Sequence, residues 1–514
     1  MEAAWLLLRV LAGLWFSATL LRPGAEAEVV AVDGRRAVAA TGEDFVCATL
    51  DWWPPEKCDY GTCAWGRASL LNLVRDDDAH LDLSNKVLLN AVRAFAPLTL
   101  RLGGSLQDKV VYGTADLRRP CTPFVKNASE MHGFTQGCLP MRRWDELNDF
   151  FRKSGAKIVF GLNALNGRVL LPDGSQGGPW DYTNAASLIR YTVNQGYRIH
   201  GWELGNELSG SGVGTRVGVN QYAADVVALR SLIDRIYEGN PSKPLVIAPG
   251  GVDTHLVEKI LNPSYLDGMA STFSNLQGIL NSAGTSTVAW VGEAGGAYNS
   301  GHHLVTDSFV FSFWFLDQLG MSAKYDTKSY CRQSLIGGNY GLLNTTTFQP
   351  NPDYYSALLW HRLMGTKVLA TTFSGSNKIR AYAHCARNSP GITLLLINLS
   401  GNTTTHVSVT SAATTHKQGV KKHSRKTKHV HVPGGFTGFA EAAGSMRNEY
   451  HLTPKDGNLQ SQIMLLNGRA LATDADGNIP RFEAVKVDAA RPITVAPYSI
   501  VFSHIPHFSA PACS

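Results

Sequence analysis

The sequence predicts an α/β fold: a (β/α)8 TIM-type barrel followed by a smaller antiparallel β-sandwich. Strand-like and helix-like segments alternate from residue 45 to residue 365, which is typical of a parallel sheet with crossover helices. After Gly365 the segments become short, alternating strands, as in a β-sandwich. The chain of 514 residues is also too long for one ordinary core, so we expect a large and a smaller domain.

Seven segments of the first part have the β-branched and aromatic composition of strands. They are Phe45–Trp52, Pro97–Ser105, Lys157–Ala164, Ile199–Glu207, Leu245–Pro249, Thr287–Glu293 and Ser322–Leu335. Five segments show the apolar period of a helix. They are Met141–Lys153, Trp180–Gln195, Val219–Glu238, Thr306–Gln318 and Pro352–Met364. The predicted barrel spans residues 45–365.

The predicted barrel lacks about one βα unit near its sixth strand. Gly251, just after the fifth strand, runs directly into Val252 and the next helical stretch. No helix followed by an apolar strand lies between them, although a βα unit takes roughly 30 residues of a typical barrel. Such a barrel must recruit a substitute strand or leave two edges unpaired beside the strand ends.

The β-sandwich domain is predicted for residues 366–514. Its clearest strands are Lys378–His384, Gly391–Ser400 and Pro492–Phe502. The early segment Glu28–Ala40 is predicted to join this domain as a further strand.

Residues 1–27 resemble a secretory signal peptide with cleavage after Ala27. They contain an apolar stretch, Val10–Leu21, and small residues near the cleavage site. No lysine or arginine precedes Arg9, so an uncleaved anchor is the alternative. We expect a secreted protein, extracellular or in the cell wall. A lysosomal, vacuolar or membrane-associated location, including peripheral association, is the alternative.

Eight cysteines and four N-x-S/T sequons agree with an oxidising secretory route. Cys58 and Cys63 are close in sequence, as are Cys121 and Cys138, but the pairing stays open. A zinc site is the competing interpretation, but there is no C-x-x-C pair, and we predict no metal and no cofactor. The sequons begin at Asn127, Asn344, Asn398 and Asn402.

The chain carries a net charge of +6 and a basic stretch, His416–His431, with six lysines and arginines. A solvated loop is one interpretation of this stretch, and contact with a polyanion is the other. For a secreted chain, acidic polysaccharide is a better partner than nucleic acid. We expect a monomer.

Two glutamates 86 positions apart, Glu207 and Glu293, each end a strand-like run that is followed by a small residue or turn. Parallel barrel strands end on the same face, where active sites are built. Glycoside hydrolysis needs such a pair, because one carboxyl protonates the leaving oxygen and the other meets the sugar carbon or activates a water. Asn206, beside Glu207, can bond a sugar hydroxyl. The alternative is two unrelated, solvated surface glutamates.

Several motifs together are similar to those of the heparanase family of retaining glycosidases, glycoside hydrolase family 79. The two acids lie in Trp202-Glu203-Leu204-Gly205-Asn206-Glu207 and Val291-Gly292-Glu293-Ala294-Gly295-Gly296-Ala297-Tyr298. Supporting segments are Leu100–Ser105, Tyr330–Gln333 and Gly337–Tyr340. The resemblance covers the chain from about residue 40 onward, and the plant heparanase-like proteins are the most similar members.

The resemblance implies a retaining hydrolase of β-glucuronosyl linkages in acidic glycans or proteoglycans, with Glu207 as acid/base and Glu293 as nucleophile. The residues that it implies for the sugar pocket are Asp51, Asn206, Tyr298, Gly338 and Tyr340. The alternatives are a turn glycine at Gly338 and packed core tyrosines. Arg332 either helps to keep Glu293 charged or is a loop arginine in a surface ion pair.

Family members carry, after the fifth strand, a segment that ends in a strand with a His-His-x-Tyr-like motif, and this chain lacks it. We therefore expect reduced stability and little or no turnover. A glycan-binding pseudoenzyme is the alternative function, and a purely structural cell-wall protein is a third.

Overall fold

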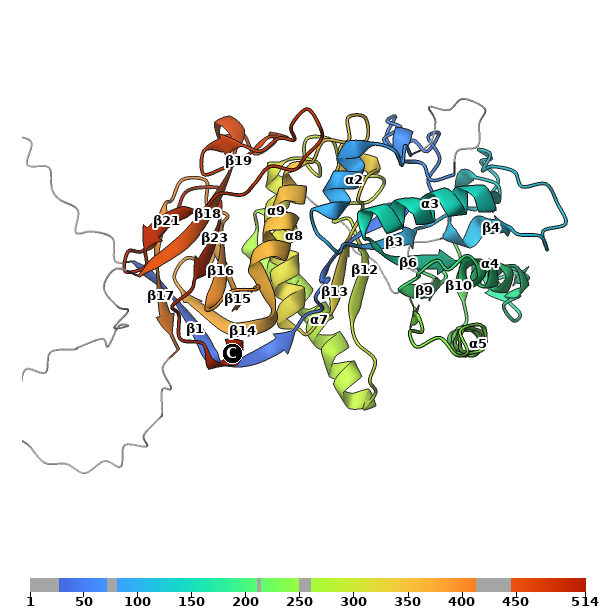
Figure 1. The fold of residues 1–514 in the computed structure, drawn as a ribbon, viewed down its shortest axis with the longest axis horizontal. Helices are drawn as coiled ribbons and strands as arrows, with labels where there is room; N and C mark the ends of the chain where they lie inside the picture. Colours follow the sequence, from blue (N-terminus) through green and yellow to red (C-terminus); the bar gives the residue numbers. More distant parts are fainter. Residues whose placement is uncertain (1–26, 72–80, 210–213, 249–259, 413–444) are drawn as a thin grey trace, which may run out of the picture.

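The computed structural model describes residues 27–71, 81–209, 214–248, 260–412 and 445–514. A parallel α/β part and an antiparallel β part lie next to each other along its long axis (Figure 1). Three sequence predictions concern residues outside these ranges: the signal segment up to Glu26, the junction of Gly251 with Val252, and the basic stretch His416–His431.

The α/β part is built on a curled parallel sheet of seven strands in the order β11-β9-β6-β3-β2-β13-β12. The strands are β2 (Val46–Asp51), β3 (Thr99–Gly103), β6 (Lys157–Leu162), β9 (Gly201–Leu204), β11 (Leu245–Ile247), β12 (Trp290–Ala294) and β13 (Ser329–Arg332). The central strands are buried on both faces, as expected for a sheet covered by helices. The predicted α/β class is confirmed. Six of the predicted strands each contain one of these strands, and the seventh, Thr287–Glu293, ends one residue before β12 does.

The sheet is open among the described residues, because β11 and β12 are its two edge strands. β11 pairs only with β9, and β12 pairs only with β13, within the described ranges. β11 is also short and partly exposed.

Seven α-helices accompany the sheet in the described ranges. They are α2 (Lys86–Arg93), α3 (Met141–Ser154), α4 (Thr183–Asn194), α5 (Val219–Ile236), α7 (Pro263–Ala283), α8 (Phe309–Lys324) and α9 (Pro352–Leu363). The five predicted helices are confirmed. The predicted strand Ser322–Leu335 began too early, because its first three residues complete α8. Of the helices in the described ranges, none is long and apolar enough to span a membrane.

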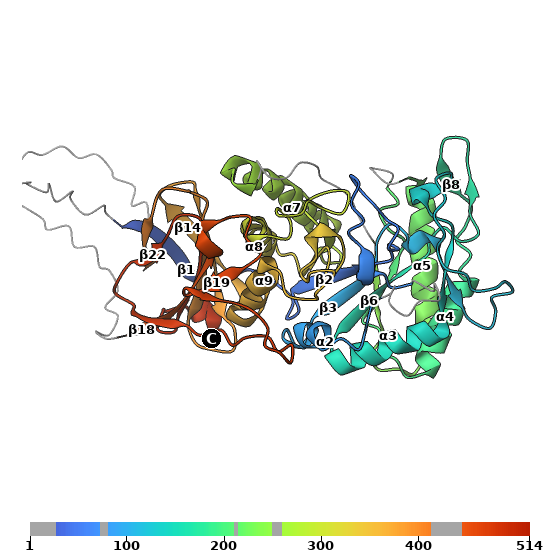
Figure 2. The ribbon, with the colours of Figure 1, turned by 90° about the horizontal axis from the view of Figure 1, so that it is seen from above.

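Helices α7 and α8 differ in burial. α8 is buried from Phe309 to Ala323, as expected for a helix that is apolar on all sides. α7 starts with an Asn262 cap and Pro263, but buries only three of its 21 residues. α7 lies beside α8 (Figure 2), at the open side of the parallel sheet.

The antiparallel part is an eleven-stranded sheet with one parallel pair. Its strand β1 (Glu28–Ala40) runs antiparallel to β14 on one side and parallel to β17 on the other. Its other strands are β14 (Met364–Ser374), β15 (Ile379–Ala386), β16 (Ile392–Asn398), β17 (Thr405–Ser411), β18 (Met446–Pro454), β19 (Met464–Leu466), β20 (Arg469–Ala470), β21 (Val485–Asp488), β22 (Ile493–Val495) and β23 (Ile500–Ile505). β16 is buried on both faces. On one face of β16, Leu394 and Leu396 belong to the hydrophobic core of the antiparallel part. On the other face, Leu395 and Ile397 belong to the core shared with the α/β part.

Two small sheets complete the α/β part. One pairs β4 (Val110–Gly113) with β5 (Gly137–Pro140), and the other contains β7 (Val169–Leu170), β8 (Ser175–Gly177) and β10 (Arg216–Val217).

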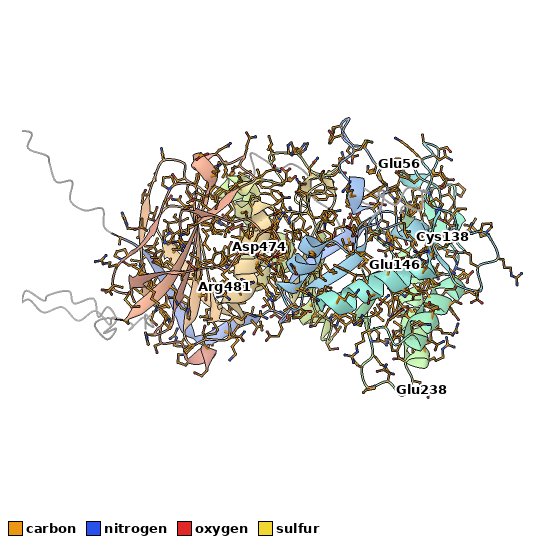
Figure 3. The ribbon with its side chains drawn as sticks, turned by 45° about the horizontal axis from the view of Figure 1, so that its top comes forward. Glu56, Cys138, Glu146, Glu238, Asp474 and Arg481 are labelled. Carbon is orange, nitrogen blue, oxygen red and sulfur yellow. A yellow bond between two sulfur atoms is a disulfide. The ribbon has the colours of Figure 1, made fainter. Side chains whose placement is uncertain are left out.

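All eight cysteines are paired. Cys47 and Cys331 join the neighbouring strands β2 and β13, and Cys385 joins Cys513 near the C-terminus. The remaining bridges are Cys58–Cys63 and Cys121–Cys138. Cys138 lies at the end of the molecule away from the antiparallel sheet, whereas Asp474 and Arg481, in the connection between β20 and β21, lie closer to its middle (Figure 3).

Candidate active site

A cavity of about 1060 Å³ lies at the carboxyl ends of the parallel strands and continues between β11 and β12. Five of the seven predicted site residues line it: Asn206, Glu207, Glu293, Tyr298 and Tyr340. Ligand pockets typically measure about 300 to 1,000 Å³. The cavity is therefore at the upper end of this range.

A tight turn after β9 directs Glu207 into the cavity. Gly205 has φ +73°, and a Cβ there would lie 2.4 Å from Leu208 and 2.9 Å from Ala164, so only glycine fits. Glu207 itself adopts φ +49°, a left-handed conformation that is uncommon for residues other than glycine. Such backbone strain is typical of functional sites.

A buried carboxylate fixes this turn. Asp108 is 6% exposed and accepts hydrogen bonds from the backbone N–H of Asn206 (2.8 Å) and of Ala164 (2.7 Å). Asp108 thus joins the residues that follow β9 to those that follow β6.

Arg101 on β3 donates to Glu293 and to two residues around the turn that carries Glu207. Its Nε donates to Glu203 at 2.8 Å and its two terminal nitrogens donate to Glu293 (2.5 Å) and to the side-chain oxygen of Asn206 (2.8 Å). Arg101 is 2% exposed, so these charge-assisted bonds are shielded from water. They fix the position of the Glu293 carboxylate beside the guanidinium.

Glu207 has a different environment. Burial, together with repulsion from Glu293, raises the pKa of Glu207 to about 7, against the opposing effect of Arg101. A carboxyl group with this pKa holds its proton up to neutral pH, as a general acid must. Two carboxyls in one cavity with different surroundings are the pattern of an acid and its partner nucleophile or base.

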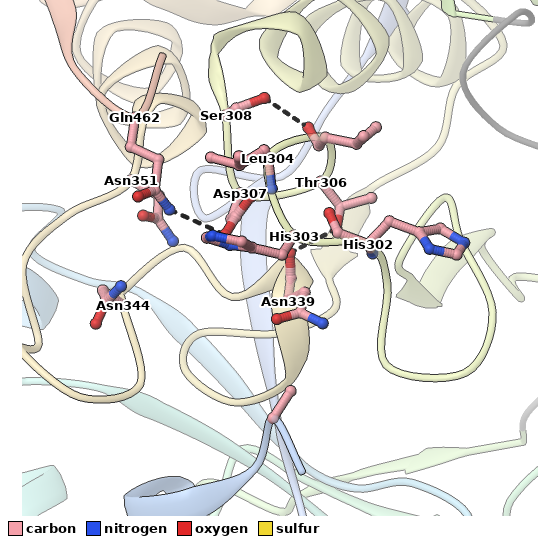
Figure 4. Close-up of polar contacts among 12 residues, drawn as sticks. His302, His303, Leu304, Thr306, Asp307, Ser308, Asn339, Asn344, Asn351 and Gln462 are labelled. Carbon is pink, nitrogen blue, oxygen red and sulfur yellow. Dashed lines mark hydrogen bonds and ion pairs between the residues drawn. The ribbon is translucent and has the colours of Figure 1, made fainter. Parts of the chain in front are cut away.

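The other two predicted pocket residues lie just outside the cavity wall. Asp51 is buried behind Gln333, whose side chain lines the cavity and donates to Asp51 at 2.8 Å. Burial, with repulsion from Glu293, raises the pKa of Asp51 to about 7. Gly338 lines a neighbouring pocket of about 240 Å³, next to the residues drawn in Figure 4.

Both predictions for Arg332 are wrong. Arg332 is fully buried and pairs with Asp353 at 3.0 Å, with its guanidinium 4.6 Å from the ring centre of Phe311. Side chains alternate along a strand, so Gln333 faces the cavity while Arg332 faces α8 and α9. The arginine that bonds Glu293 is Arg101, not Arg332.

Sequence reasoning missed Arg101, Glu203 and Asp108 as site residues. A signal was present for two of them, since Leu100-Arg101-Leu102 and Trp202-Glu203-Leu204 each place a charge within an apolar strand, and such a buried charge requires a partner. No comparable signal marks Asp108. Among the described residues, no group of three or more His, Cys, Asp or Glu is arranged to hold a metal ion.

Comparison with known proteins identifies similar sequences over most of the chain. The family model described as "Glycosyl hydrolase family 79, N-terminal domain" matches residues 27–252 and 250–320. Heparanase-like protein 3 of Arabidopsis thaliana is 54% identical over 94% of each chain. Baicalin-beta-D-glucuronidase of Scutellaria baicalensis is 41% identical over 94% of this chain and 93% of its own.

A solved structure shares the fold. The 4-O-alpha-L-rhamnosyl-beta-D-glucuronidase from Fusarium oxysporum 12S matches with a TM-score of 0.57 and 13% identity, over 93% of this chain and all of its own. The resemblance to heparanase-like proteins is therefore confirmed, and the chain belongs to glycosyl hydrolase family 79.

Proposed function

We propose that this chain has the site of a retaining glycoside hydrolase for β-glucuronosyl linkages in acidic glycans or proteoglycans. One observation carries the proposal: two strand-end glutamates share a cavity, one with a raised pKa and the other paired with Arg101. The glucuronosyl specificity is supported by the relative named as a β-D-glucuronidase.

In the proposed mechanism, Glu293 attacks the anomeric carbon while Glu207 gives its proton to the leaving oxygen. The glycosidic bond breaks and a sugar ester forms on Glu293. Glu207, now ionised, takes a proton from a water that attacks the same carbon and restores the free Glu293 carboxylate. This double displacement retains the anomeric configuration and requires carboxyl groups about 5 to 5.5 Å apart.

The proposed sugar contacts are Asp51, Asn206, Tyr298, Gly338 and Tyr340. Arg101 donates a hydrogen bond to the side-chain oxygen of Asn206. This bond fixes the amide group, so that its nitrogen is oriented to bond a sugar hydroxyl. Gln333 donates a hydrogen bond to Asp51 at the cavity wall. Asp51 therefore either orients Gln333 toward a ligand or contacts the ligand itself once the Gln333 side chain has moved away.

We further propose that the chain lacks one βα unit between β11 and β12, and that its turnover is low for this reason. Both edge strands line the cavity that contains the two glutamates. The two segments of the family match meet at residues 250–252. The alignment with the Arabidopsis relative extends over 519 positions, more than the 514 residues of this chain, so it includes positions where only the relative has residues. A glycan-binding pseudoenzyme is the second candidate function.

A chromogenic β-glucuronide assay tests these proposals. The native chain is compared with a restored chain that carries the additional segment of the Arabidopsis relative after Gly251. We expect at least about 100-fold higher kcat in the restored chain, because displaced catalytic groups can cost that factor. Equal rates would contradict the missing-unit proposal, and glycan binding without turnover in both chains would favour the pseudoenzyme.

In the restored chain, Glu207→Gln and Glu293→Gln each remove one of the two carboxyls. We expect both variants to lose at least about 10³-fold in kcat on a substrate with a poor leaving group. Glu238→Gln, at an exposed turn position, is the matched control. Full activity in either glutamate variant would remove that residue from the mechanism.

The remaining proposals are a secreted monomer, extracellular or in the cell wall, with an acidic polysaccharide as partner. Four disulfides support an oxidising compartment. Recovery of the chain from culture medium, with its mass in solution, tests both statements.

A further inference from the structure

The four sequons differ in what the fold does with their asparagine side chains. N-glycosylation replaces one hydrogen on the asparagine Nδ2 with an oligosaccharide, so the folded chain must leave room for the sugar at that nitrogen. The sugar comes from a lipid diphosphate donor: the bond between its first carbon and phosphate breaks, a carbon–nitrogen bond forms, and one proton is released.

Asn398, at the end of β16, is fully buried. Its Nδ2 donates to the carbonyls of Thr403 (2.8 Å), Ala496 (2.9 Å) and Val495 (3.2 Å), and its Oδ1 accepts from the backbone N–H of Ser400. A sugar on this nitrogen would displace the strand connection that the side chain holds together. Asn398 thus ties the end of β16 to the chain that follows β22.

Asn402, four residues later, is exposed. Its Oδ1 accepts from the hydroxyls of Ser400 and Thr403, both at 3.0 Å. Its Nδ2 has no hydrogen bond to any described residue. The side-chain nitrogen of Asn402 is therefore accessible to modification, whereas that of Asn398 is buried and hydrogen-bonded.

Asn127 and Asn344 resemble Asn402 in this respect. Exposed Asn127 accepts from the backbone N–H and hydroxyl of Ser129. Half-buried Asn344 accepts from the backbone N–H of Thr346 and from both N–H and hydroxyl of Thr347. In both side chains the oxygen is bonded, while Nδ2 has no partner within the described residues.

Asn344 also lies on the wall of the 240 Å³ pocket, together with His303 and Asn339 (Figure 4). A sugar on Asn344 would fill the mouth of that pocket. Asn344 is not among the residues that line the cavity of Glu207 and Glu293.

We infer that Asn127, Asn344 and Asn402 are N-glycosylation sites and that Asn398 is a structural tie that stays unmodified. This inference rests on the proposed secretory route and is independent of catalysis. The fold thus separates four identical sequence signals into three acceptors and one internal hydrogen-bond donor.

Site mapping tests the inference. The full chain is expressed in a secretory eukaryotic host, its N-glycans are released by an amidase that leaves aspartate, and peptides are analysed by mass spectrometry. We expect aspartate at positions 127, 344 and 402 and asparagine at 398. A glycan at Asn398, or a chain unmodified at any of the other three positions, would overturn the inference.

A second measurement tests the structural role without glycosylation. In chain produced without glycans, Asn398→Asp loses both amide donors and places a carboxylate against three carbonyls, so we expect Tm to fall by at least about 4 °C. The matched control, Asn402→Asp, should leave Tm within about 1 °C. Equal Tm values for the two variants would contradict the structural role of Asn398.

Discussion

At the residue scale, Arg101 makes the two candidate catalytic glutamates unequal. It bonds Glu293 directly, whereas its effect on Glu207 is weaker than burial and the repulsion from Glu293. Glu203 provides a second negative charge for the same guanidinium. A lysine could not replace Arg101, because one ammonium cannot present the planar fork that reaches three acceptors.

The pKa of Glu207 sets the pH dependence that we predict. Its folded value of about 7 lies above the ordinary 4.5, so the acid form persists to neutral pH and is lost as pH rises through 7. In the restored chain, kcat/KM should therefore fall about tenfold for each pH unit above 7. A pH–rate profile checks this, and a profile that stays flat well above pH 7 would contradict the assignment.

The titration of Glu207 must be distinguished from that of neighbouring acids, because burial also raises the pKa of Asp108 to about 7. Glu207→Gln, assayed with an activated aryl leaving group that needs no acid, is the control. Its rate should no longer fall through pH 7 if Glu207 is the titrating group.

Asp108 is predicted to be a positioning residue. Asp108→Asn keeps one acceptor but turns an amide N–H toward either Ala164 or Asn206, where a backbone N–H already points. The turn that carries Glu207 should shift, and kcat should fall by about 10² with little change in KM. Kinetics of the restored chain check this, with Asp173→Asn as an exposed control. A matching loss in the control, or unchanged kcat, would contradict the role.

At the element scale, we expect the two edge strands β11 and β12, which have one strand partner each among the described residues, to be the least stable part of the α/β half. β11 has three residues, and α7 buries little of its surface. The backbone groups on the free side of an edge strand lack ladder partners. Low local stability follows from few buried contacts and solvent-accessible backbone groups.

Hydrogen exchange tests this expectation. Backbone amides of β11 and β12 should exchange much faster than those of β2 and β3 in the native chain. Insertion of the proposed additional segment should slow the edge amides by about fivefold or more, since each new hydrogen bond contributes about 1 kcal/mol. Exchange in β2 serves as the internal control. Equal protection of edge and centre in the native chain would show that another segment already covers the edges.

At the scale of the whole molecule, the two parts share buried contacts around α8. Arg380 on β15 bonds Asp317 on α8 at 2.7 Å, and Tyr382 donates to the same carboxylate at 2.6 Å. A Cβ at Gly320 would lie 2.4 Å from the Tyr382 ring, so glycine permits this close approach. The antiparallel sheet therefore supports the parallel sheet from one side.

Disulfides are predicted to contribute according to the loop that each one closes. Cys385–Cys513 spans 128 residues and Cys58–Cys63 spans 5. In the chain-entropy model, removing the first should cost about 5 kcal/mol of unfolding free energy and removing the second about 2 kcal/mol. Denaturant unfolding of Cys385→Ala/Cys513→Ala and Cys58→Ala/Cys63→Ala checks the ranking. A larger loss for the short loop would contradict it.

The sequence alone determined the α/β class, the seven parallel strands, five of the helices and the family. These follow from local periodicity and from motifs that surround Glu207 and Glu293. Local patterns carry this information because burial on one or both faces restricts residue type at each position.

Only the tertiary structure decided which residues act together. Arg101, Glu203 and Asp108 are separated in sequence from the residues they bind, and Arg332 faces away from Glu293 although the two belong to neighbouring strands. The same holds for Asn398 and Asn402, whose sequons look alike but whose burial is opposite. Contacts between distant segments depend on sheet register and strand facing, and these are properties of the assembled chain.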